Sequence, residues 1–144
     1  MDTLPLAAYR ELAQFRYEIR RFLQFSENAA RQYGLEPQQH QALLTLKGLP
    51  PGTLPTVGEL AMRLFLKPHS AVGLVDRLEE GGLVTRKPSP VDARQVLVAL
   101  TRRGEAVLRK LSVVHREELR ESGPRLLESL QAVLDGHHAE ANRA

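Results

Sequence analysis

Two short amphipathic segments lie next to each other in the middle of the chain, separated by a tight connection at residues 65–67. The first has Thr56 and Glu59 at the spacing of a capping box, and its apolar residues recur at helical intervals up to Leu64. Pro68 is typical of the first turn of a second helix, which Gly81-Gly82 ends. Two short helices joined so closely predict a helix-turn-helix.

Two short β segments follow this pair of helices directly. Residues 83–87 and 95–100 are the predicted strands, and the polar turn of residues 88–94 between them contains two prolines. A hairpin in this position is the wing of a winged helix-turn-helix. We therefore predict a fold that is mainly α with a small β-hairpin wing, an α+β class.

Further helices flank the module on both sides. Residues 5–33 carry apolar side chains alternately four and three positions apart, as in a heptad seam, and Gly34 follows them. Residues 37–47 predict a short helix opened by proline. After the winged module, Thr101 is a good N-cap for a fifth helix that reaches about residue 120. Gly123-Pro124 predicts a break before a last helix.

The outer helices have more apolar surface than the central module can cover. We expect three parts: an N-terminal dimerisation helix (1–33), a DNA-binding winged helix-turn-helix (34–103) and C-terminal dimerisation helices (104–144). An intramolecular bundle is the alternative for the outer helices.

Composition excludes several classes of protein. The chain has 144 residues and no cysteine, which excludes disulfides, cysteine-ligated zinc and a thiol switch. No apolar run approaches 18 residues and no signal peptide is evident, so we expect a cytoplasmic protein with no membrane contact. The sequence also lacks a glycine-rich phosphate loop and a Gly-x-Ser-x-Gly elbow. We expect neither an enzyme nor a cofactor.

The net charge of +3 is concentrated in one segment. Residues 67–103 hold seven basic and four acidic residues, whereas the rest of the chain is balanced. This distribution is compatible with a face that binds a polyanion such as double-stranded DNA.

Two stretches of the sequence resemble the core of the MarR family of transcription regulators. Residues 74–84 read LVDRLEEGGLV, and residues 90–104 read PVDARQVLVALTRRG. The family pattern is a recognition helix ending in L-V-D-R-L-E-x-x-G-L-V, a wing with D-x-R, and a strand closing in L-T-x-x-G. The resemblance implies a cytoplasmic homodimer with intertwined terminal helices that grips a pseudopalindromic operator. It further implies a repressor that an aromatic or phenolic anionic effector releases from DNA.

The start of the second short helix supplies candidate contacts to DNA, because a recognition helix reads the major groove with its N-terminal residues. Lysine can contact phosphate or guanine, histidine and serine can bond bases or phosphates, and valine can meet a thymine methyl. Glycine permits close approach of the backbone. These candidates are Lys67, His69, Ser70, Val72 and Gly73. A solvated helix start is the alternative for Lys67 and His69.

The wing supplies further candidates. The resemblance implies that Arg94 enters the minor groove, which suits a guanidinium, and that Asp92 stabilises the wing loop through an internal ion pair. Arg77 either reaches phosphate or pairs with Asp92, and both roles stay open. Arg86 and Lys87 are candidate phosphate contacts, with a solvated strand as the alternative. The chain departs from the family at Pro68, Val72 and Gly73, so fewer direct base contacts are available. It also has Ser89 in the wing, where the family commonly has aspartate.

Two other functions compete with this interpretation. One is a metal-responsive regulator, because His115 lies near Glu118 and His137-His138 precede Glu140. The other is a winged-helix protein-interaction module without DNA binding. The ligand-binding residues are not evident from the sequence. Four aromatic residues of the first helix are candidates for a pocket lining, and dimer core or surface is the favoured alternative: Phe15, Tyr17, Phe22 and Phe25.

Overall fold

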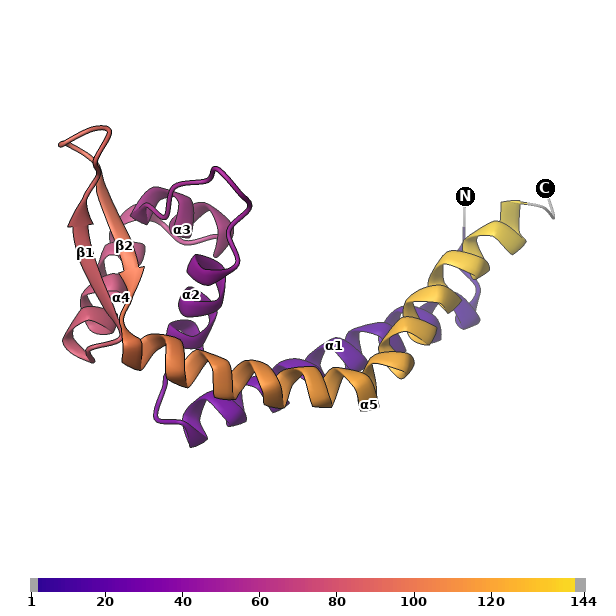
Figure 1. Ribbon diagram of the computed structural model, residues 1–144. Coiled ribbons are helices and arrows are strands. Elements are labelled where there is room, and N and C mark those ends of the chain that lie inside the picture. The colour runs from indigo at the N-terminus through magenta and orange to yellow at the C-terminus, as the bar shows by residue number, and fades with distance from the viewer. Residues whose placement is uncertain (1–2, 142–144) are drawn as a thin grey trace. The chain divides into compact units, whose positions relative to one another are not determined.

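The computed structural model describes the backbone of residues 3–141 and the side chains of residues 3–136. In chain order its elements are α1 (Leu6–Gln32), α2 (Pro37–Lys47), α3 (Val57–Arg63), α4 (Pro68–Glu80), β1 (Val84–Pro88), β2 (Val96–Leu100) and α5 (Arg102–Ala141) (Figure 1). The mainly α fold with a β-hairpin wing is confirmed. α1 to α4 and both strands lie within a residue or two of where the sequence places them.

The chain forms two compact units. One is residues 30–112, which we call the lobe, and the other is residues 1–29 with 113–144, which we call the arm. Within the described residues, no helix is long and apolar enough to cross a membrane.

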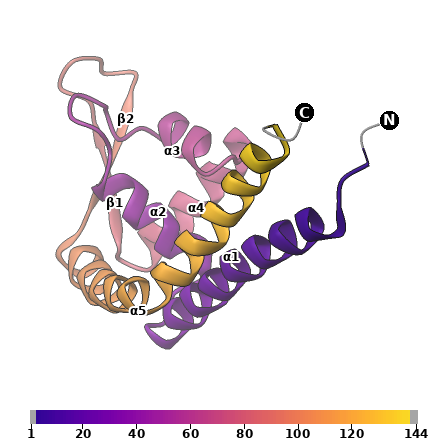
Figure 2. The same cartoon turned by 90° about the vertical axis from the view of Figure 1, so that its right-hand side faces the viewer.

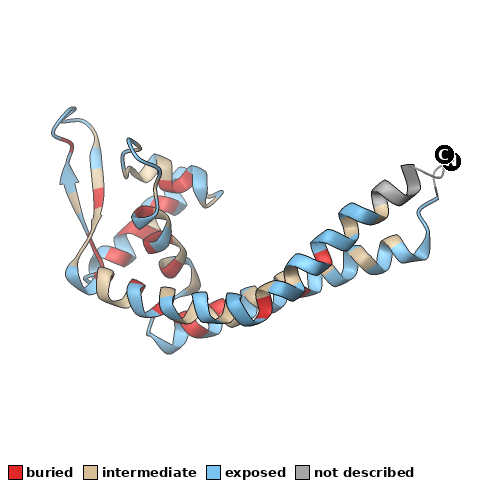
Figure 3. Cartoon of the chain, turned by 45° about the vertical axis from the view of Figure 1, so that its right-hand side comes forward, coloured by how far each residue is buried: buried red, intermediate tan, exposed pale blue. Residues whose placement is uncertain are grey.

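The lobe has an apolar core, built from the inward faces of α2, α3, α4, the hairpin and the first turns of α5 (Figure 3). On α4 the buried positions are spaced by three or four residues, which is one face of a helix. The largest apolar side chains that are almost fully buried in this core are Leu43, Leu60, Leu74, Leu78, Val75, Val84, Val98 and Leu111. The core leaves the opposite face of α4 in solvent.

The wing is an antiparallel hairpin whose register runs from Val84 opposite Leu100 to Pro88 opposite Val96. The second edge of β2 is also occupied. Thr56 forms an isolated bridge with Leu97, and the Val98 amide donates to the Pro55 carbonyl at 2.8 Å. The loop before α3 therefore adds a short third strand-like segment, which no alternation in the sequence indicated.

The N-cap predictions hold in different degrees. Thr101 is confirmed as the cap of α5: its hydroxyl accepts from the Gly104 amide at 3.1 Å and donates to the Gly82 carbonyl at 2.6 Å. Thr56 caps α3 by accepting from the Glu59 amide at 3.1 Å. The second hydrogen bond of a capping box, from the Thr56 amide to the Glu59 carboxylate, is not formed. This part of the prediction was wrong, because the Glu59 carboxylate accepts from Arg63 at 2.8 Å instead.

The predicted helix break at Gly123-Pro124 was also wrong, because α5 is one helix of 40 residues with Pro124 inside it. A proline removes one backbone donor, which is a local penalty. Ser122 and Ser129 lie on either side of Pro124, seven residues apart, and both are buried, whereas Pro124 is exposed. One packed face thus continues across the proline, and this tertiary packing outweighs the local penalty.

The arm is an antiparallel pair formed by α1 and α5, which run alongside each other in two views (Figure 1 and Figure 2). Near one end, His115 Nε2 lies 2.8 Å from Ser26 Oγ, and its ring meets Phe22 and Phe25 edge-on. Near the other end, Gly136 packs against Glu11.

Many large apolar side chains of this pair remain exposed. In α1 they include Leu6, Tyr9, Leu12, Tyr17 and Leu23. In α5 they include Val113, Leu119, Leu127, Leu130 and Leu134. The arm thus presents an extensive apolar surface.

Candidate nucleic-acid interface

The first turn of α4 presents its side chains to solvent. Lys67 occupies the N-cap in an extended conformation, with φ −66° and ψ 149°. Lys67, His69, Ser70 and Val72 are all exposed, whereas the intervening Ala71 is buried in the core. The structure therefore brings four of the five helix candidates to one outward surface, next to the positive end of the helix dipole.

Gly73, the fifth helix candidate, is half-buried. A Cβ at this position would meet Arg77 Nη1 at 3.7 Å, which is an ordinary contact. Among the described residues, no contact requires glycine at this position.

The wing loop is held by two short polar side chains. Ser89 is buried, and its hydroxyl accepts from the amides of Val91 and Asp92 at 3.2 and 3.4 Å. Asp92 Oδ1 accepts from the Arg94 amide at 3.0 Å, and lies 3.8 Å from the Arg94 Nε. These bonds fix the loop mainly through backbone donors, an Asx-turn type of contact. The Arg94 side chain itself is 96% exposed.

Arg86 is engaged within the protein. Its guanidinium donates to Asp76 at 2.5 Å and to Glu79 at 3.0 Å, and its backbone amide donates to the other Glu79 oxygen at 3.0 Å. Partial burial lowers the pKa of Arg86, but the bonds to the two carboxylates outweigh it and raise the pKa above its usual value. Two acidic side chains already match this charge. Arg86 thus links the hairpin to α4, a role the sequence did not suggest, and its contact with phosphate stays a prediction.

Arg77 also has a partner other than the one considered from the sequence. Its Nε lies 3.4 Å from Glu36 Oε2, at the residue that precedes α2. The alternative in which Arg77 pairs with Asp92 is therefore wrong. The Arg77 side chain is 45% exposed, so it links α4 to the start of α2 while remaining accessible. Lys87, on the wing strand, is exposed.

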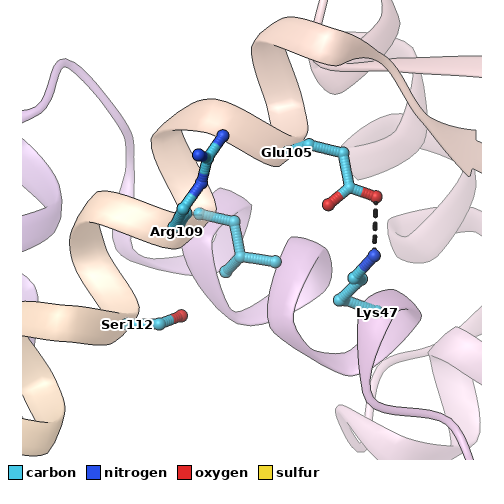
Figure 4. Close-up of a pocket in the computed structure, with 5 residues that line it drawn as sticks. Lys47, Glu105, Arg109 and Ser112 are labelled. Atoms are coloured by element: carbon cyan, nitrogen blue, oxygen red, sulfur yellow. Dashed lines mark hydrogen bonds and ion pairs between the residues drawn. The ribbon is translucent and has the colours of Figure 1, made fainter.

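A hollow of about 300 Å³ lies elsewhere on the lobe, between the end of α2 and the first turns of α5 (Figure 4). Its lining consists of Lys47, Glu105, Leu108, Arg109 and Ser112. Lys47 Nζ and Glu105 Oε1 form an ion pair at 2.9 Å across it. Two cationic side chains, one carboxylate and one apolar side chain thus line a small space, a combination that no motif in the sequence indicated.

The metal-responsive alternative gains no support from the described side chains. Among them, no group of three histidine, aspartate or glutamate residues could hold an ion. His115 instead contacts Ser26 and two phenylalanines. His137, His138 and Glu140 lie outside the described side chains.

An exposed helix start beside a hairpin with an exposed arginine at its tip defines the winged helix-turn-helix class. Residues 33–95 match the model of the MarR family. The HTH-type transcriptional regulator YsmB of Bacillus subtilis is 32% identical over 90 residues, which are 62% of this chain and 60% of YsmB. For some other curated relatives, the match spans less than half of their length.

Solved structures show the same fold. AbsC of Streptomyces coelicolor, a MarR family transcriptional regulator, matches with a TM-score of 0.75 at 19% identity, over 100% of both chains. A mutant of MepR from S. aureus, solved bound to an oligodeoxyribonucleotide, matches with a TM-score of 0.64 at 19% identity, over 88% of this chain and 94% of MepR. CouR of Rhodococcus jostii, solved bound to p-coumaroyl-CoA, matches with a TM-score of 0.60 at 25% identity, over 78% of this chain and 82% of CouR. The chain is thus similar to MarR family regulators over residues 33–95, and it has the fold of solved MarR family structures.

Proposed function

We propose that the protein is a homodimeric, cytoplasmic regulator of transcription that binds a pseudopalindromic operator. The observation that carries this proposal is the joint exposure of the first turn of α4 and of Arg94 at the wing tip. One can enter a major groove while the other reaches the neighbouring minor groove. The MepR structure with an oligodeoxyribonucleotide supports DNA as the partner of this fold.

The exposed side chains divide by chemistry into positioning and reading groups. Lys67 and Lys87 supply charges for phosphates, which set affinity but carry no sequence information. His69 and Ser70 can bond base edges, and Val72 can meet a thymine methyl. Gly73 allows the backbone to approach the groove closely. Arg77 contributes a phosphate contact from the accessible part of its side chain.

We further propose that residues 1–33 and 104–144 form the dimer interface, with residues 34–103 as the DNA-binding part. Support comes from the exposed leucines of the arm, of which Leu127 is 65% exposed. Stable obligate interfaces bury roughly 2,000 Å² or more, and an apolar surface of this kind suits such burial. We expect light scattering at micromolar concentration to give twice the chain mass of 16.1 kDa. A soluble 16.1 kDa species would contradict the dimer.

The operator is tested by footprinting on genomic fragments selected by gel shift. A two-fold dimer places its recognition helices about one helical turn apart, so half-sites should be centred about 10–10.5 base pairs from each other. Protection of a pseudopalindrome with this spacing is the expected result. Failure to bind any duplex would instead favour the protein-interaction module.

The hollow beside Lys47 supports the proposal of a ligand-responsive repressor. Glu105 pairs with one of its two cations, Lys47, so the lining keeps an excess of one positive charge, which suits a monoanion, while Leu108 suits an apolar ring, as in an aromatic or phenolic acid. CouR, solved with p-coumaroyl-CoA, supports an effector of this chemistry in the fold. Such a ligand releases DNA only by binding the non-binding state of the dimer more tightly. The same gel shift, repeated with a panel of aromatic carboxylates, should show release. Indifference to the panel would contradict this chemistry.

A further inference from the structure

Phe65 is the most exposed large apolar residue of the described chain, with 96% of its surface accessible. It lies in the connection between α3 and α4, two residues before Lys67. The sequence predicted a tight connection here, but it did not predict that the Phe65 side chain would be exposed. A phenylalanine left entirely in water gains nothing from burial, so the folded chain alone gives no reason for it.

The backbone at Phe65 makes this choice of residue more unusual. Three helices end in the same hydrogen-bond pattern. The amide of the residue after the C-cap donates to the carbonyl three positions back, and the next amide donates to the carbonyl five positions back. These two residues are Gly34 and Leu35 after α1, Phe65 and Leu66 after α3, and Gly82 and Leu83 after α4. This pattern requires a left-handed residue, usually glycine. Gly34 has φ 80° and Gly82 has φ 72°, whereas Phe65 has φ 54°.

Phe65 is therefore a strained, exposed aromatic residue at a position where the same chain twice uses glycine. A side chain in this conformation is disfavoured, and such strain is often retained at functional sites. Phe65 is also continuous with the proposed DNA-binding surface, because Lys67, His69 and Ser70 follow it and are exposed.

We infer that Phe65 packs on the sugar–phosphate backbone of the operator, with its ring against a deoxyribose. This inference rests on the proposed function. In a helix-turn-helix the first helix crosses the DNA backbone while the second enters the groove, so the turn between them lies over the backbone at the groove edge. The phosphates there suit Lys67, and the apolar surface available to a phenyl ring is the carbon face of the sugar.

The test replaces Phe65 with residues that suit the left-handed conformation, Phe65→Gly and Phe65→Asn. Both variants should bind the operator about ten-fold more weakly, which is about 1.4 kcal/mol and corresponds to burial of part of a phenyl ring. Both should have a melting midpoint no lower than that of the wild type, because the strain is removed. Leu44→Ala, which shortens another partly exposed apolar side chain of the lobe, should leave operator affinity unchanged.

Two further measurements identify the contact. The slope of log affinity against log salt should stay unchanged in Phe65→Gly, because no phosphate charge loses its partner. The ten-fold loss should also persist on a duplex with deoxyuridine in place of thymidine, and on non-operator DNA, because every nucleotide has the same sugar. Loss of the effect on the deoxyuridine duplex would assign the ring to a thymine methyl and overturn the sugar contact.

Wild-type affinity in both Phe65 variants would overturn the inference, and a fall in the melting midpoint would show that Phe65 serves folding instead. A wild-type chain that binds no duplex would overturn the proposed function itself, and this outcome is distinct from both.

Discussion

Gly104→Ala should lower the free energy of unfolding by about 3 kcal/mol, at the upper end of what overpacking usually does. Gly104 is buried in the first turn of α5, and a Cβ there would overlap the Leu83 carbonyl oxygen. That oxygen cannot move away freely, because it accepts from the Thr101 amide at 3.0 Å, beside the Thr101 cap of α5. Urea denaturation at a fixed protomer concentration measures the change.

Gly58→Ala is the matched control, because Gly58 also lies in the first turn of a helix. A Cβ there would meet the Thr56 hydroxyl at 3.9 Å, an ordinary contact. Alanine is favoured over glycine in helices by about 0.5–1 kcal/mol, so this variant should be slightly more stable than the wild type. If both substitutions changed the free energy of unfolding equally, the close approach of the Leu83 carbonyl would not be the reason for glycine at position 104.

Arg94→Ala should weaken operator binding by about 1–3 kcal/mol for each wing. The loss should be larger where A·T-rich flanks narrow the minor groove, because the guanidinium then loses a stronger negative potential. Since Asp92 and Ser89 hold the loop through backbone amides, the fold should survive the change. Fluorescence anisotropy on labelled operators with different flanks provides the measurement.

Two lysine variants serve as comparisons for Arg94→Ala. Lys87→Ala should weaken binding uniformly across sequences and reduce the salt slope by about one. Lys110→Ala removes the same charge from an exposed position of α5 and should leave affinity nearly unchanged. Unaltered affinity in Arg94→Ala, with the fold intact, would remove the wing from the mechanism.

Local signals in the sequence determined most of the elements, because each depends on residues close in the chain. Pro37 and Pro68 open α2 and α4, and Thr101 caps α5. Gly34 and Gly82 supply the positive φ that ends α1 and α4. The same kind of reasoning failed at Pro124, where packing over both neighbouring turns decided the outcome.

Only the tertiary structure decided the partners of the charged side chains, because Coulomb attraction depends on distances between segments. Sequence spacing could not show that Asp76 and Glu79 of α4 hold Arg86 of the wing, or that Arg77 pairs with Glu36. The hollow at Lys47 likewise needs two helices that are far apart in the chain. Phe65 is a further example: a phenylalanine in a sequence predicts burial, and only the tertiary structure shows that this side chain lies in solvent on a left-handed backbone.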